Sequence, residues 1–360
     1  MIWRFLHIST AAVIWAWSTG VVLMLVVSLA DRWNVFSEGM VLYGLHYLPP
    51  FWIFLLALPP ILVGLLTVSR RPALGLLLLT TCNILLFGDV SYQMLFHGPP
   101  PAAGNHPQLR VSTINVRYYS EGVAETLRAI RGLDSDVALL SENVLTAAQR
   151  QQMAEHLGDY TFHAGKNGET ALLSRLPVLS VQEVDLPSKQ ASLHGPNTVE
   201  STQDNPNRSF MHAVVDVNGV PVHLISVRLI AGRGPKRGTF RENLRWAHYL
   251  LETQQKEVDF FLDYVQGLQG PVIFGGDINA PPNSLTVRKI RLVAEDARAS
   301  DHFFGGFTFP SHRPGIRLDY LFSMNGAQAL RSEIHLDVTI TDHFPVSAVF
   351  RLTPPPKSGS

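Results

Sequence analysis

The predicted fold depends first on the stretch PVIFGGDIN, at residues 271–279. Its first four residues are a short apolar run bounded by turn formers, which predicts a strand. The glycine pair that follows leads into Asp277 and Asn279, a carboxylate and an amide at the end of that strand. A single acid at a strand end is most often a turn former or a helix cap. Other strand ends therefore decide whether these two residues belong to a site.

Polar residues follow or close apolar runs at several other places. They are Asn115, Glu142, Asp319, Asp342 and His343. Hard cations such as Mg²⁺ take oxygen ligands and need only one or two protein carboxylates. In-line attack on phosphorus also needs a base for the water and a cation to neutralise the phosphoryl oxygens. Together these residues predict a divalent-metal-dependent phosphoesterase.

The segments between these positions predict a mixed α/β domain over residues 110–353. Short β-type runs occupy 110–116, 136–140, 171–174, 211–217, 222–229, 318–322 and 346–352, and helical spacing occurs at 123–132 and 240–266. Asn218-Gly219 is a two-residue hairpin signal. Because strands dominate and helices intervene, we predict an α/β sandwich, followed by a disordered tail at 354–360.

Charge is distributed unevenly along the chain. Residues 1–96 carry four Lys/Arg and three Asp/Glu, which leaves 25 basic and 26 acidic residues of the 29 and 29 total for 97–360. The C-terminal part is therefore near neutral, which argues against nucleic acid as a partner without removing it. Cys82 is the single cysteine, so the chain has neither an intrachain disulfide nor a cysteine metal site.

Three apolar runs, at 11–30, 48–68 and 73–95, approach the length that spans a bilayer and predict a transmembrane region over 1–96. The alternative is a cleaved signal peptide followed by buried helices. The placement of Arg4, Arg70 and Arg71 predicts a cytoplasmic N-terminus, and three spans then put the catalytic domain outside the cytoplasm. Residues 97–109, rich in Pro, Gly and Ala, are expected to form a linker.

The ordered motifs resemble the endonuclease/exonuclease/phosphatase superfamily, which includes DNase I-like nucleases, inositol polyphosphate phosphatases and neutral sphingomyelinases. They read INV (114–116), LLSEN (139–143), ALLSRLPV (171–178), GGDIN (275–279), RLDY (317–320) and TDHFPV (341–346). The membrane-tethered layout looks like bacterial members, including teicoplanin-resistance-type membrane proteins. The resemblance implies a four-layer, DNase I-like α/β sandwich with two central sheets, a place in the bacterial cytoplasmic membrane, and Mg²⁺ or Mn²⁺ as the cofactor.

The resemblance also implies roles for the metal and phosphate contacts. Glu142 matches the metal-binding glutamate, with Asn115 beside it as a metal or phosphate contact, and Asp342 is expected among the metal ligands. Asn279 is expected to contact the phosphate.

The catalytic roles follow from the same motifs. Asp277 is expected to position the nucleophilic water, and His343 to act as general base or as the proton partner of the transition state. Asp319 would orient His343 and fix its tautomer. Thr341 stands where the family usually has serine, and Ser141 where it usually has glutamine.

Arg228 is the larger departure, because many relatives carry a histidine there. Arginine cannot accept a proton, but it grips phosphate oxygens with a fork of donors. We favour a phosphate clamp at Arg228. The alternative is that Arg228 pairs with Glu142 or Asp277 in an impaired or substrate-specific enzyme.

We expect a membrane-anchored phosphoesterase that hydrolyses a phosphodiester or a (di)phosphate, with a lipid-linked phosphate or a phospholipid headgroup at the extracytoplasmic face as the best candidate substrate. One alternative is a surface nuclease that acts on DNA or RNA. Another is a catalytically impaired, membrane-anchored binding module, against which the near-complete set of site residues argues.

Overall fold

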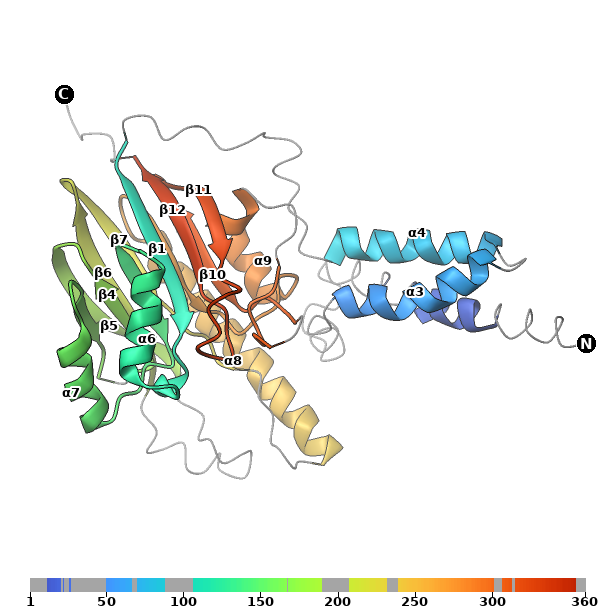
Figure 1. Cartoon of the computed structure of the whole chain (residues 1–360), viewed down its shortest axis with the longest axis horizontal. Coiled ribbons are helices and arrows are strands. Elements are labelled where there is room, and N and C mark those ends of the chain that lie inside the picture. Colours follow the sequence, from blue (N-terminus) through green and yellow to red (C-terminus); the bar gives the residue numbers. More distant parts are fainter. Residues whose placement is uncertain are drawn as a thin grey trace, which may run out of the picture. The chain divides into compact units, whose positions relative to one another are not determined.

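The computed structural model describes residues 12–20, 22, 26, 50–66, 70–87, 106–166, 168–189, 207–231, 239–300, 306–312 and 315–353. The chain divides into two compact units. One contains residues 1–90 and 283–285, and the other contains residues 91–282 and 286–360. Figure 1 shows the elements coloured along the sequence.

The N-terminal unit is helical in its described residues. It contains helical residues 12–20, α3 (Pro50–Leu66) and α4 (Arg70–Phe87). A small apolar core joins them, and its buried members are Ile14, Ala57, Ile61, Ala73 and Leu76.

The predicted membrane spans are not confirmed. Among the described residues, no helix combines the length and the apolar character needed to cross a membrane. α3 has 17 residues, about 25 Å at 1.5 Å per residue. α4 begins with Arg70 and Arg71, which we expected in a loop between spans. Residues 11, 21, 23–25 and 27–30 of the predicted span at 11–30, and residues 88–95 of the one at 73–95, lie outside the described residues.

The C-terminal unit contains two six-stranded sheets. The first has the order β11-β12-β1-β2-β4-β3 and the second the order β5-β6-β7-β8-β10-β9. The first sheet is built from β1 (Gln108–Asn115), β2 (Val137–Ser141), β3 (Thr161–Ala164), β4 (Thr170–Ser174), β11 (Ala327–Ile334) and β12 (Val346–Leu352). The second is built from β5 (Val178–Lys189), β6 (Asn207–Val217), β7 (Val220–Ser226), β8 (Val272–Asp277), β9 (Glu295–Asp296) and β10 (Asp319–Met324).

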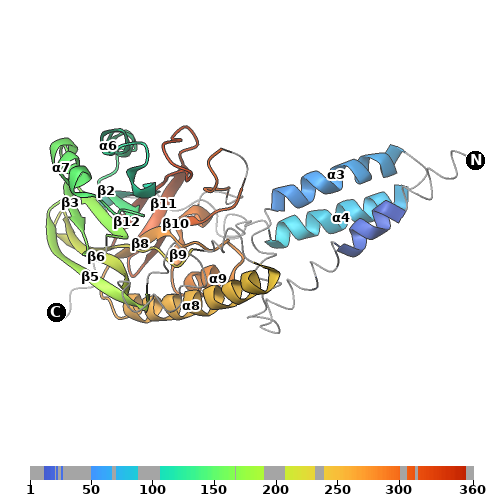
Figure 2. The same ribbon diagram turned by 90° about the horizontal axis from the view of Figure 1, so that it is seen from below.

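Helices cover the outer faces of the two sheets (Figures 1 and 2). They are α6 (Val123–Gly132) and α7 (Ala147–His156) on the first sheet, and α8 (Phe240–Gln266) and α9 (Leu285–Arg291) on the second. Two short 3-10 turns, η1 (Arg117–Tyr119) and η3 (Ala297–Ser300), complete the unit. The predicted four-layer α/β sandwich is therefore confirmed.

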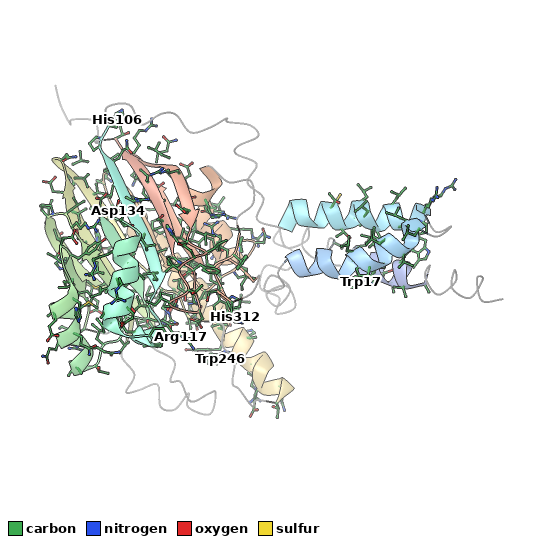
Figure 3. All side chains as sticks on the ribbon, in the orientation of Figure 1. Trp17, His106, Arg117, Asp134, Trp246 and His312 are labelled. Atoms are coloured by element: carbon green, nitrogen blue, oxygen red, sulfur yellow. The ribbon has the colours of Figure 1, made fainter. Side chains whose placement is uncertain are left out.

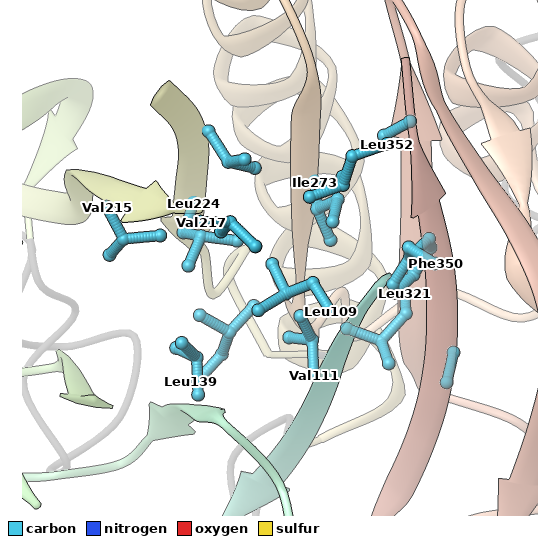
Figure 4. Close-up of a cluster of buried hydrophobic side chains, with 14 of the residues drawn as sticks. Leu109, Val111, Leu139, Val215, Val217, Leu224, Ile273, Leu321, Phe350 and Leu352 are labelled. Carbon is cyan, nitrogen blue, oxygen red and sulfur yellow. The ribbon is translucent and has the colours of Figure 1, made fainter. Parts of the chain in front are cut away.

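Alternation along the central strands explains the layers. In β2, Val137 and Leu139 enter the core between the sheets, whereas Ala138 and Leu140 pack under α6. In β8, Ile273 points into the same inter-sheet core and Phe274 points towards α8. Figure 4 shows the inter-sheet cluster. A strand that is buried on both faces has a continuous run of apolar residues, and the sequences of β2 and β8 show such runs.

Several strand boundaries differ from the prediction, and β6 begins at Asn207 where 211 was expected. β1 begins at Gln108, inside the predicted linker 97–109, because it pairs with β12 and buries Leu109 completely. β7 ends at Ser226, whereas a strand to Leu229 was expected. The predicted tail at 354–360 lies outside the described residues.

Candidate active site

Two carboxylates meet at one end of the second sheet. β8 ends on Asp277 and β10 begins on Asp319, and these residues are direct partners in an antiparallel ladder. Directly opposed residues carry their Cβ atoms about 5 Å apart. Both side chains are buried, at 1 % exposure. Pairing therefore joins two acids that are 42 positions apart in the sequence.

Gly276 allows this arrangement. Its φ is +146°, and a Cβ atom there would lie 1.9 Å from the carbonyl oxygen of Val227. Only glycine lets β8 approach β7 this closely. The backbone N–H of Asp277 then donates to Ser141 Oγ at 3.2 Å, which ties the end of β8 to the end of β2 in the other sheet.

His343 lies against Asp319. Its Nδ1 is 2.8 Å from Asp319 Oδ2, and its backbone N–H donates to Thr341 Oγ1 at 3.1 Å. The ring of Phe309 covers it, with centroids 4.7 Å apart. Burial alone would lower the pKa of His343, but attraction to Asp319 and Asp277 raises that pKa to about 9. The ring is thus a fixed imidazolium at neutral pH.

Asp277 is the most connected acid of the site. Its Oδ2 accepts from Asn115 Nδ2 at 3.0 Å, and its Oδ1 accepts from the backbone N–H of Asn279 at 3.1 Å. Burial raises the pKa of Asp277 to about 6, with His343 opposing the rise and Asp319 adding to it. A carboxyl with that pKa is ionised at neutral pH and still able to take up a proton.

Asn279 and Glu142 both adopt positive φ, 52° and 54°. Asparagine tolerates this region, but glutamate seldom does, and such outliers concentrate at functional sites. The side chain of Asn279 donates to the carbonyl of Leu229 at 2.9 Å. Asn279, Asn115, Asp277, Asp319 and His343 are thus gathered at one end of the two sheets.

The donor set fits a divalent cation. Asp277 and Asp319 each offer a carboxylate oxygen and His343 a ring nitrogen, and these atoms lie within 4.8 Å of one another. Because His343 is protonated at neutral pH in the metal-free site, the two carboxylates are the groups that would hold the ion, with His343 beside them. Asp319 Oδ1 is buried and has no hydrogen-bond partner among the described residues. Carboxylate oxygens are the ligands that hard cations prefer. This set differs from the predicted metal ligands Glu142, Asn115 and Asp342. Asp342 is more exposed, and its Oδ1 lies 3.8 Å from Nε of Arg117. Arg117 follows β1 and is labelled in Figure 3.

Arg228 is already paired. Its Nη2 is 2.8 Å from Glu142 Oε1, its Nη1 is 3.1 Å from Glu169 Oε1, and its Nε is 3.9 Å from Asp277 Oδ2. Burial lowers the pKa of Arg228, but the three carboxylates more than reverse that effect. The pairing alternative describes this geometry, and the phosphate clamp stays a prediction.

Sequence reasoning missed three buried charged residues behind Arg228, namely Glu169, Arg208 and Glu257. Glu169 stands directly before β4, Arg208 lies in β6 and Glu257 lies in α8. The one local signal was an acid immediately before an apolar run, at Glu169 in GETALLS.

Comparisons with known proteins agree with this architecture. The model of the Endonuclease/Exonuclease/phosphatase family matches residues 80–343. The endonuclease/exonuclease/phosphatase from Bacteroides vulgatus is 17% identical, with 68% of this chain and 99% of that chain covered and a TM-score of 0.52. Humanized D. rerio TDP2 is 15% identical, with 68% and 99% covered and a TM-score of 0.51. At these identities the similarity concerns the fold. No curated protein matches the chain.

Proposed function

The chain belongs to the endonuclease/exonuclease/phosphatase family, and we propose that it hydrolyses a lipid-linked phosphoester with Mg²⁺ or Mn²⁺ at the Asp277–Asp319–His343 cluster. Membership of the family makes the chain a metal-dependent hydrolase of phosphoric ester bonds. The observation that carries the site assignment is the buried cluster itself, in which His343 Nδ1 lies 2.8 Å from Asp319 and all three ligand atoms lie within 4.8 Å.

In this mechanism, a bound divalent cation supplies Lewis-acid chemistry by withdrawing charge from the phosphoryl oxygens. His343 engages Asp319 through Nδ1, so Nε2 is the atom left to donate a proton or a hydrogen bond to the substrate. A fixed imidazolium stabilises the negative charge that develops on the phosphoryl group.

Asp277 accepts the proton of the attacking water. Asp277 is the base that this mechanism uses, and burial raises the pKa of its carboxyl in the metal-free site. Asn115 and the backbone N–H of Asn279 hold the two oxygens of Asp277 and so fix its direction. Asn279, at the start of the following loop, contacts the phosphate.

A lipid-linked substrate is supported by the N-terminal sequence. Residues 1–96 carry four Lys/Arg and three Asp/Glu, and the 17 residues of α3 include no charged side chain. Such a segment favours an apolar environment. We therefore include membrane anchoring in the proposal, with the catalytic domain outside the cytoplasm.

The test is a substrate panel with the purified full chain and Mg²⁺ or Mn²⁺. Vesicles that contain a polyprenyl diphosphate or a phospholipid are compared with a soluble aryl phosphodiester and with plasmid DNA. The proposal expects turnover of the lipid phosphoester to exceed that of DNA. Faster cleavage of DNA would replace the proposed substrate with nucleic acid, and no turnover of any substrate would favour a binding module.

A further inference from the structure

A line of buried ion pairs runs from the active site towards α8. Arg228 Nη1 is 3.1 Å from Glu169 Oε1, Arg208 Nη1 is 3.0 Å from Glu169 Oε2, and Arg208 Nε is 2.7 Å from Glu257 Oε1. None of the four side chains is more than 8% exposed. Arg208 lies in β6 and Glu257 in α8, whereas Glu169 precedes β4 and Arg228 follows β7. The line therefore joins four separate parts of the C-terminal unit.

The same residues also hold the backbone that carries Arg228. Arg208 Nη2 donates to the carbonyl oxygen of Arg228 at 2.7 Å. Glu257 Oε2 accepts from the backbone N–H of Ile230 at 2.8 Å. The position of Arg228 is therefore determined from behind by both its side chain and its main chain.

The guanidinium of Arg228 faces two acids of the site. Glu142 comes from the loop after β2 in the first sheet, and Asp277 comes from β8 in the second. Arg228 lies 2.8 Å from the first carboxylate and 3.9 Å from the second. Two acids that enclose a buried position need a counter-charge there, because an uncompensated buried carboxylate is costly. In this chain that counter-charge is a side chain.

We propose that Arg228, held by Glu169 and Arg208, is a permanent internal cation between Glu142 and Asp277, so that the active site takes up a single divalent cation. The proposal rests on the proposed function in assuming a metal-dependent site. The guanidinium of Arg228 already supplies positive charge at Glu142 and Asp277. The residues that would hold an ion are then those of the Asp277–Asp319–His343 cluster. Glu169 is a positioning residue, since it acts on the site through Arg228.

The measurement is the number of Mn²⁺ ions bound per full-length chain, with free Mn²⁺ followed by electron paramagnetic resonance. We expect one ion in the wild type, two in Arg228→Met and one in Arg228→Lys, which keeps the charge. Glu169→Ala removes the contact to Arg228 Nη1 and leaves Glu142 as the partner of that side chain, so a second Mn²⁺ should bind, more weakly than in Arg228→Met. Glu169→Gln, which still accepts the hydrogen bond of Arg228, should return the number to one.

Arg175→Met is the matched control. Arg175 follows the other end of β4 and pairs with Asp159 at 2.8 Å and Asp134 at 3.2 Å. Its loss removes two more exposed ion pairs about 20 Å along the strand from Glu169, and Mn²⁺ binding should not change.

Arg228→Met removes the counter-charge next to Glu142 and Asp277, while Glu169 keeps Arg208, and the variant can unfold the chain. The double variant Arg228→Met/Glu169→Gln removes one charge of each sign and keeps the test decisive, with two Mn²⁺ expected. Two ions in the wild type, or one ion in a folded double variant, overturns the proposal. Hydrolysis is measured separately. A wild type that binds one Mn²⁺ and hydrolyses no substrate contradicts the proposed function alone. A wild type that hydrolyses a substrate and binds two Mn²⁺ contradicts only the proposal that Arg228 is an internal cation.

Discussion

Replacing Asp319 by asparagine tests the electrostatics of the site most sharply. Asp319→Asn keeps the size of the side chain and an oxygen near His343 Nδ1, which lies 2.8 Å from the present carboxylate. It removes the nearest negative charge. Burial lowers the pKa of His343, and Asp319 makes the largest contribution that raises it. Without the charge of Asp319, the pKa of His343 should therefore fall from about 9 to near or below its ordinary 6.5.

The size of the effect follows from that difference. A rise in pKa from 6.5 to about 9 corresponds to about 3 kcal/mol of preference for the protonated folded state. The folded protein binds this proton more tightly than the unfolded chain. The stabilisation is therefore fully present below pH 6.5 and is lost as the pH rises through 9.

Two measurements on EDTA-treated protein check this prediction. Nitrogen-15 NMR of the histidine side chains gives the pKa of His343 directly, and urea unfolding at pH 6 and pH 9.5 gives the change in the free energy of unfolding. The wild type should lose about 3 kcal/mol more than Asp319→Asn over this interval, and Asp263→Asn, an exposed control on α8, should behave as the wild type. A ring that still titrates near pH 9 in Asp319→Asn would refute the reasoning.

Two further predictions concern the fold. Gly276→Ala should destabilise the protein by at least about 3 kcal/mol, because its Cβ would lie 1.9 Å from the carbonyl oxygen of Val227 at a φ of +146°. The control in urea unfolding is Gly132→Ala, whose Cβ would meet no atom within 4 Å. Equal unfolding midpoints for the two variants would contradict the close approach of β8 to β7. Burial, with the neighbouring His223, lowers the pKa of His212 to about 4, so the unfolded chain takes up this proton first and stability should fall as the pH drops from 6.5 towards 4. His212→Gln should flatten that slope in thermal melts, and an unchanged slope would assign it to other groups.

The two helices predicted in the C-terminal part show what local sequence can give. α6 and α8 begin and end where the spacing of apolar residues predicts, and Thr239 and Glu242 form a reciprocal cap at the start of α8. In contrast, α7 was not predicted, because Met153 is its single buried residue and no apolar stripe marks it. β5 was missed because much of it is exposed, so it shows little of the apolar pattern of a core strand.

Part of the active site, too, could be predicted from local sequence, and part could not. Asp277, Asp319 and His343 stand in ordered motifs at the ends of strands, and the structure brings these three together. The buried ion pairs behind Arg228 belong to no ordered motif. Glu169 is 59 positions from Arg228 in the sequence, and Arg208 is 49 positions from Glu257. Pairing over such distances depends on the assembled sheets. The predicted membrane spans rested on the length of apolar runs, which does not show where a helix begins or that Arg70 and Arg71 are part of α4.

The central claim is that the Asp277–Asp319–His343 cluster hydrolyses a phosphoester with a divalent cation. The most direct measurement is the rate of phosphodiester hydrolysis by the purified full chain with Mg²⁺ or Mn²⁺, beside Asp277→Ala, His343→Ala and an EDTA-treated sample. We predict turnover in the wild type that EDTA and either substitution abolish, with thermal melts showing that both variants are folded. Equal rates in the wild type and the folded variants would contradict the assignment of this site.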